Sequence, residues 1–343
     1  MAVTKTRVAL ADTNKQSADY VREKFDLTQE EVGPHYKKPF VLRGYRYHHL
    51  GLVECLRSCF LLHNETLNVW THLIASVAFI VMSIQLFLKE GISDSYAWPL
   101  LSYSVGRCFH FLASAGAHAL CAISPRVHHT CFFVDYAGVA IFTIPAGQSY
   151  LFYLRPLSPE LFIFKYPEVF LLFSTAVSTL TTVLVGLSRF KWHSYRYFIR
   201  SFTFIVPFVI HSLPYLYRIV ACSSKIDCEF SALAPFTRQL LWYLLAVLIT
   251  ASHVPERLFP GRFDYIGYSH SVMHVVVALG AYEQFNAVLI DFQTRRDLLS
   301  GQEITLWNSV GLFCFSSILN VIIALYLGNL IEVDESHKHK KER

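Results

Sequence analysis

The sequence has 343 residues, of which 53% are hydrophobic and only 16% are charged. A typical soluble domain carries about 25% charged residues, so the composition indicates a membrane protein. The formal net charge of +5 is too diffuse to indicate a nucleic-acid-binding protein. The first 40 residues are polar and lack the apolar core of a cleavable signal peptide, so none is expected.

The first 47 residues predict a cytosolic segment, and the first 35 or so of these are expected to be mobile. Residues 49–60 predict an amphipathic helix that lies at the membrane interface, with an ordinary juxtamembrane segment as an equally open alternative. The apolar positions of this helix are Leu52, Val53, Leu56 and Phe60.

Eight apolar segments are long enough to cross a membrane as helices, because a spanning helix needs about 20 mostly apolar residues. Short connections link them, so the predicted fold is one all-α integral membrane bundle over residues 48–330. Residues 331–343 form a charged cytosolic tail. The predicted spans are 68–88, 98–121, 131–154, 166–187, 198–220, 236–254, 269–290 and 306–328.

The distribution of Lys and Arg among the short loops predicts the orientation. The loops near 188–200 and 255–268 and the tail are rich in basic residues, and all lie on the side of the N-terminus. Both termini are therefore expected in the cytosol. The loop that contains Cys222 and Cys228 then faces an oxidising compartment, where the two cysteines could form a disulfide.

Ionisable residues inside a membrane are costly and usually functional, and four of them are predicted at one depth. His118 lies three residues before the cytosolic end of its span, and Asp135 lies four residues after the start of the next. His270 and His274 begin the seventh span. At 1.5 Å per residue, all four lie within ~8 Å of the same interface.

His270 and His274 are spaced i and i+4, so they project from one face of one helix. Together with His118 they suit a zinc ion, and three protein ligands would leave a fourth position for water, as in catalytic sites. Asp135 could orient that water, and Ser114 could hydrogen-bond a substrate carbonyl. The alternatives are that these histidines only pack, or that a rival ligand takes part; the candidate rivals are His72 and His253.

Several motifs resemble the progestin and adiponectin receptor family. They are Glu65-Thr-Leu-Asn68-Val-Trp-Thr-His72, Ser114-x3-His118 with Asp135 after it, and His270-x3-His274, within a match from residue 41 to about 291. The segment His253–His270 is most similar to the membrane progestin receptor branch. The predicted eighth span, in addition to a seven-helix bundle, is also typical of that branch.

The resemblance implies a zinc ion held by His118, His270 and His274, with Asp135 beside it. It also implies kinship with zinc-dependent ceramidases, which hydrolyse a lipid amide. Three further polar residues begin the first span, and they either brace the metal site or only cap and join helices. They are Glu65, Asn68 and His72.

Three functions follow as hypotheses. The first is a membrane receptor that binds a progestin-type steroid in its aromatic bundle and signals inward, with a G protein as a possible partner through the basic 188–200 loop. The second is a zinc-dependent ceramidase-like amidase that acts on a sphingolipid and could be gated by a ligand. The third is a zinc ion that only joins helices. The plasma membrane is the expected location, and internal membranes stay open as the alternative.

Overall fold

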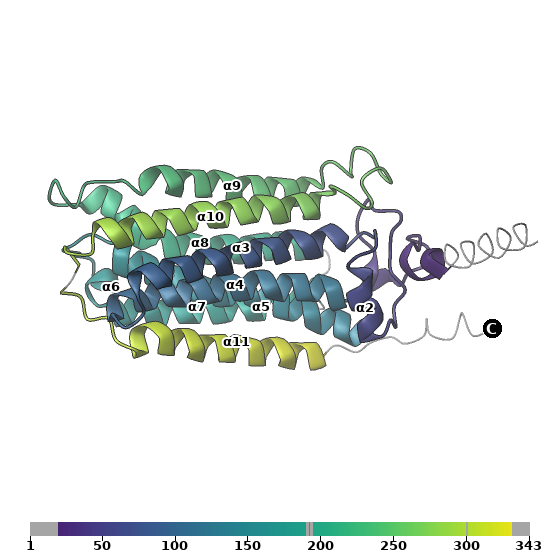
Figure 1. The fold of residues 1–343 in the computed structure, drawn as a ribbon, viewed down its shortest axis with the longest axis horizontal. Helices are drawn as coiled ribbons and strands as arrows, with labels where there is room; N and C mark the ends of the chain where they lie inside the picture. The colour runs from purple at the N-terminus through teal and green to yellow at the C-terminus, as the bar shows by residue number, and fades with distance from the viewer. Residues whose placement is uncertain (1–19, 190–191, 193–194, 300, 331–343) are drawn as a thin grey trace, which may run out of the picture.

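A computed structural model describes residues 20–189, 192, 195–299 and 301–330 of the chain. Long helices run side by side along one axis and form a single bundle (Figure 1). The described residues contain no β-strand, only an isolated bridge between Leu27 and Tyr45. The predicted charged tail, 331–343, and part of the basic 188–200 loop lie outside the described residues.

The helices follow the predicted apolar segments closely. Their bounds are α3 Thr66–Glu90, α4 Trp98–Leu120, α5 Pro125–Ser149, α7 Pro167–Leu187, α8 Arg196–Ala221, α9 Leu233–Ser252, α10 Ser269–Thr294 and α11 Leu312–Asn329. A π-helical turn, Tyr150–Leu154, extends α5, and another, Trp307–Gly311, precedes α11. The short helices are α2 Leu52–Ser58 and α6 Phe162–Lys165, with 3₁₀ turns at Pro34–Tyr36 and Ser95–Ala97.

Seven of the helices in the described part of the chain are long and apolar enough to cross a membrane, instead of the eight predicted. The difference is α4, which has 23 residues but is not among the seven. Arg107, His110 and His118 lower its hydropathy, and all three are buried. A helix that the bundle surrounds can carry polar residues because it presents few of them to lipid.

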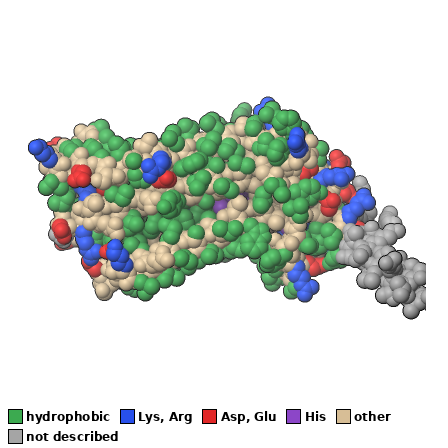
Figure 2. Space-filling view, turned by 45° about the horizontal axis from the view of Figure 1, so that its top comes forward, with side chains coloured by type: hydrophobic (Ala, Val, Ile, Leu, Met, Phe, Trp, Pro, Cys, Tyr) green, Lys and Arg blue, Asp and Glu red, His purple; other side chains and the backbone are tan. Residues whose placement is uncertain are grey.

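The molecular surface agrees with a membrane protein (Figure 2). Hydrophobic side chains cover most of the length of the bundle, and charged side chains gather mainly toward its two ends. Helix α2 forms where the amphipathic helix is predicted, and its apolar side chains point outward. Leu52 is 56% exposed and Phe60, just after the helix, is 77% exposed, as an interfacial helix requires.

Helix α5 begins at Pro125, six residues before the predicted start of the third span. Ser124 caps this helix by accepting a hydrogen bond from the backbone N–H of Val127 (3.2 Å), and proline is favoured at the first helical position. A span that starts at residue 131 would leave His128 and His129 in a loop, whereas both are buried in the first turns of α5.

The N-terminal segment is more ordered than expected over residues 20–47. Leu27, Val32 and Tyr36 are buried in a small core, so the prediction of a mobile chain up to about residue 35 is wrong for this part. Tyr268, which directly precedes α10, completes the same core. Residues 20–47 thus cover one end of the bundle, which we call the histidine end because His118 and His270 lie there.

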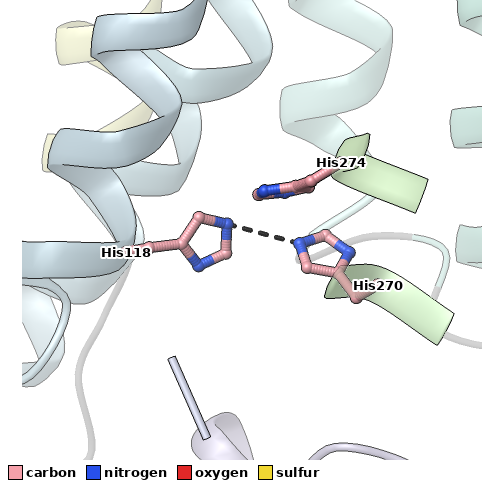
Figure 3. A group of neighbouring side chains, drawn as sticks. All are labelled: His118, His270 and His274. Atoms are coloured by element: carbon pink, nitrogen blue, oxygen red, sulfur yellow. Dashed lines mark hydrogen bonds between the residues drawn. The ribbon is translucent and has the colours of Figure 1, made fainter. Parts of the chain in front are cut away.

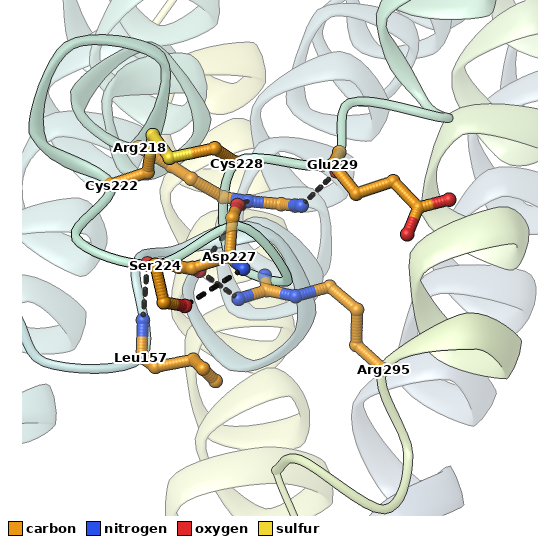
Figure 4. Close-up of a disulfide and its surroundings, with 8 residues drawn as sticks. All are labelled: Leu157, Arg218, Cys222, Ser224, Asp227, Cys228, Glu229 and Arg295. Carbon is orange, nitrogen blue, oxygen red and sulfur yellow. Dashed lines mark hydrogen bonds and ion pairs between the residues drawn. A yellow bond between two sulfur atoms is a disulfide. The ribbon is translucent and has the colours of Figure 1, made fainter.

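The opposite end, which we call the disulfide end, contains a buried network of ion pairs (Figure 4). Arg218 pairs with Asp291 (2.5 Å), and Arg295 pairs with Asp227 (2.7 Å). Cys222 and Cys228 form a disulfide in the loop that carries Asp227. The network connects α8, α10 and this loop.

Candidate metal centre

Three imidazole rings meet at the histidine end (Figure 3). His118 comes from the last turn of α4, and His270 and His274 come from the first two turns of α10. One potential ligand atom from each ring lies within 4.8 Å of the others, and His118 and His274 are buried while His270 is half-buried. The Nε2 atoms of His118 and His270 are 3.3 Å apart. This cluster could hold a metal ion.

The hydrogen bonds of two rings leave a lone pair for a metal. The Glu65 carboxylate accepts a hydrogen bond from Nδ1 of His118 (2.8 Å), and the backbone carbonyl of Asn68 accepts one from Nδ1 of His274 (3.2 Å). Because each neutral ring then carries its proton on Nδ1, its Nε2 has a free lone pair. Metal-binding histidines are usually oriented by an acceptor on the other nitrogen. The donor set therefore fits a divalent ion of the zinc type.

Glu65 is the centre of the hydrogen-bond network behind the cluster. Its two oxygens accept from Nζ of Lys38 (2.7 Å), Nδ2 of Asn68 (2.6 Å) and Nδ1 of His118. Burial acts to raise the pKa of Glu65, but the positive charge of Lys38 and the contact with His118 outweigh it and hold the pKa well below its usual range. Glu65 is therefore a carboxylate, as an acceptor for His118 requires.

Asn68 connects this network to α10. Its Oδ1 accepts from the hydroxyl of Ser271 (2.8 Å), and its Nδ2 also donates to the hydroxyl of Tyr268 (2.5 Å). Lys38 donates to the same tyrosine oxygen (2.5 Å). Glu65 and Asn68 thus lie behind the histidines and contact His118 and His274 through these hydrogen bonds.

The two helix ends that carry the histidines are fixed by residues distant in sequence. Arg46 is buried and donates to the carbonyls of His118 (2.5 Å) and Ala119 (2.8 Å) at the end of α4. Glu256 accepts from the backbone N–H of Ser269 (2.7 Å) at the start of α10. These contacts satisfy backbone groups that have no partner within a helix.

Sequence reasoning missed Lys38, Arg46 and Tyr268, because their roles depend on contacts between distant segments. The available signal was the number of apolar and aromatic residues between Tyr36 and Tyr47, which favours an ordered segment over a mobile one.

The remaining predicted residues lie around the cluster rather than within it. His72 stacks flat on His274, with ring centroids 3.7 Å apart, and neither of its nitrogens makes a hydrogen bond to a described residue. Asp135 is buried, interacts with the hydroxyl of Ser114 and lies close enough to His118 to be affected by its charge. His253 is at the end of α9, outside the three-ring group.

A cavity of about 410 Å³ lies beside the cluster at the histidine end. His118 and His270 line its inner wall, and Tyr36 and Lys38 of the N-terminal segment line another side. His253 also lies on the wall. A small polar molecule could therefore reach the cluster.

Fold and cluster together define an all-helical membrane protein with a buried group of three histidines. A family model described as "Haemolysin-III related" matches residues 60–285 of the chain. The chain belongs to this family, whose curated members matched here are membrane progestin receptors.

Three of these relatives show the extent of the similarity. Membrane progestin receptor gamma of Homo sapiens is 31% identical over 314 residues, which cover 88% of this chain and 93% of the relative. Membrane progestin receptor delta of Homo sapiens is 34% identical over 270 residues, covering 77% and 78%. Membrane progestin receptor alpha of Mus musculus is 29% identical over 315 residues, covering 90% and 89%. The similarity thus extends over most of the chain.

Proposed function

We propose that the protein is a membrane receptor for progestin-type steroids, built around a zinc ion held by His118, His270 and His274. The observation that carries the first part is the similarity over most of the chain to proteins named membrane progestin receptors. The second part rests on the three convergent imidazoles and the tautomers that their partners impose.

The proposal includes the topology. We infer that α4 also crosses the bilayer, giving eight spans, because it packs along α3 and α5, buries most of its residues and is as long as its neighbours. We further infer that the histidine end faces the cytosol, since the basic loops at 188–200 and 255–268 are on that side. The plasma membrane is the proposed location, and a G protein is the proposed cytosolic partner.

Steroid binding is tested with the purified full chain in nanodiscs and a radiolabelled progestin. The expected result is saturable binding of about one steroid per protein, displaced by unlabelled progestin and not by cholesterol. Binding no greater than to empty nanodiscs would contradict the receptor function.

A second function, a zinc-dependent lipid amidase of the ceramidase type, is favoured by a different observation. Three protein ligands leave room in a tetrahedral zinc site, and the cavity of about 410 Å³ reaches the cluster. When bound, zinc would supply a Lewis acid for the amide carbonyl. Asp135, which is buried and interacts with His118 and Ser114, would accept a proton during hydrolysis and return it to the leaving amine.

The amidase function is tested by following fatty-acid release from a short-chain ceramide, with and without progestin. Release by the wild-type protein that the His274→Ala variant loses would support hydrolysis, and a change on adding progestin would make the enzyme ligand-gated. If chelation lowers thermal stability while no release is detected from zinc-loaded protein, the metal only joins α4 and α10.

A further inference from the structure

The cavity beside the histidine cluster has a second wall that the proposed function does not use. This wall comes from the start of α5, the end of α7 and the first turns of α8, and it contains two arginines. Its main residues are His129, Phe132, Tyr136, Arg189 and Arg200. We call it the arginine wall.

The two arginines of this wall are held by neutral partners. Arg189 donates to the hydroxyl of Tyr136 (3.3 Å), and its guanidinium lies 5.0 Å from the ring centre of Phe132. Arg200 donates through Nε to the hydroxyl of Ser188 (3.1 Å), and its guanidinium lies 5.3 Å from the ring centre of Tyr136. Each guanidinium therefore retains donors that these contacts do not use.

The carboxylates near the cavity are committed elsewhere. Glu65 is held by Lys38 and His118, and Glu256 accepts from the backbone and side chain of Ser269. Among the described residues, no ion pair neutralises Arg189 or Arg200.

Asp135 is a carboxylate whose charge acts on Arg189, but the two are not among the ion pairs of the described residues. Burial lowers the pKa of Arg189, and the like charge of Arg200 acts in the same direction. Two cations side by side in a half-buried site are costly unless an anion neutralises them.

Further polar atoms on the cavity wall have no partner among the described residues. Nδ1 of His129 and Nδ2 of Asn64 are both buried without a hydrogen bond, although the two side chains are only 7% and 2% exposed. Unsatisfied buried polar atoms are rare in folded proteins and call for an unseen partner. An amide nitrogen can only donate, so the expected partner of Asn64 is an acceptor.

We propose that this cavity binds the phosphate of an anionic lipid head group, held mainly by Arg189 and Arg200. A phosphate offers several acceptor oxygens and up to two negative charges, and guanidinium groups bind it through paired hydrogen bonds. Basic pockets between membrane helices are suited to anionic head groups, and α5 and α8 both belong to the apolar helices that reach the bilayer. The site stands independently of steroid binding.

The test uses the purified full chain and native mass spectrometry, which counts bound molecules. The probes are a short-chain phosphatidylinositol phosphate, short-chain phosphatidylcholine and free glycerol phosphate. The test variant is Arg189→Gln/Arg200→Gln. The matched control is Arg57→Gln/Arg126→Gln, which removes two exposed arginines near the same end of the bundle.

The expected result is one bound phosphatidylinositol phosphate on the wild-type and control proteins, with affinity reduced roughly tenfold or more in the test variant. Phosphatidylcholine, whose phosphate is neutralised by choline, should bind much more weakly. Unchanged metal content in the test variant would show that it is folded, since neither arginine contacts the histidine cluster.

Equal losses in the test and control variants would overturn the proposal, because binding would then follow overall charge. If glycerol phosphate binds as tightly as the lipid, the cavity is a phosphate site, but the proposal that the phosphate belongs to a lipid is overturned. Full binding by a folded test variant would overturn the site itself.

Discussion

The two ends of the bundle both bury charged or polar clusters, but only one cluster is complete by itself. At the disulfide end, Arg218 and Arg295 each pair with an aspartate at 2.5–2.7 Å. At the histidine end, Nε2 of His118 faces Nε2 of His270 at 3.3 Å instead of a charged partner, and one nitrogen from each of three rings lies within 4.8 Å of the others. Satisfied buried networks serve stability, whereas a convergent set of free acceptors indicates a site for a ligand or metal.

The largest expected effect is the loss of zinc when a proposed metal ligand is removed. His274→Ala should reduce zinc in the purified protein from about one ion per chain to nearly none, because two nitrogens cannot hold the ion tightly. Elemental mass spectrometry measures the zinc content. The matched control is His253→Ala, which alters the cavity wall outside the cluster and should leave zinc unchanged. Equal zinc in both variants would contradict the ligand set.

At the disulfide end, Asp291→Ala should lower the free energy of unfolding by about 3–5 kcal/mol, because it leaves Arg218 buried without its charge partner. Denaturant unfolding in detergent measures this change. Zinc content should stay at the wild-type level in the fraction that folds. If zinc falls in proportion to the loss of stability, the two ends are not independent.

The Glu65→Gln change should have an effect of intermediate size, on the affinity for zinc. This change keeps the size of the side chain but removes the carboxylate that accepts from Nδ1 of His118 and pairs with Lys38. Loss of such an outer partner typically weakens metal affinity by about 10–100-fold. Competition with a calibrated zinc chelator measures the affinity, and a value equal to that of wild type would mean that Glu65 does not orient the ligand.

The smallest effect is expected for Cys222→Ser/Cys228→Ser. The disulfide closes a loop with a sequence separation of 6, so its loss should cost at most about 2 kcal/mol of stability. Thermal unfolding with and without reductant provides the measurement. Zinc and steroid binding should not change, and a large loss of either would indicate that the loop contributes to the site.

The helices and the three histidines were predictable because each depends on local pattern. Hydropathy over about 20 residues identifies a span, and the i, i+4 spacing places His270 and His274 on one face. The start of α5 could also be predicted, since Ser124 followed by Pro125 is a typical helix start. Counting apolar residues alone instead placed the start of this span at residue 131.

The supporting residues could not be predicted in the same way. Lys38 reaches Glu65, and Arg46 reaches the end of α4, across 27 and 72 residues of sequence. Such contacts depend on how the N-terminal segment packs against Tyr268, which no local pattern specifies. Helix α4 falls outside the seven apolar helices because polar residues such as Arg107 and His110 lower its hydropathy, and the sequence alone does not show that the bundle buries them.

The most direct test of the central claim is X-ray absorption spectroscopy at the zinc edge on the purified wild-type protein. The account predicts stoichiometric zinc with three imidazole nitrogens and one further light atom at about 2.0–2.1 Å. The His118→Ala variant should lose this spectrum. Sulfur ligands, an all-oxygen shell or protein that stays folded and binds no zinc would contradict a metal centre formed by His118, His270 and His274.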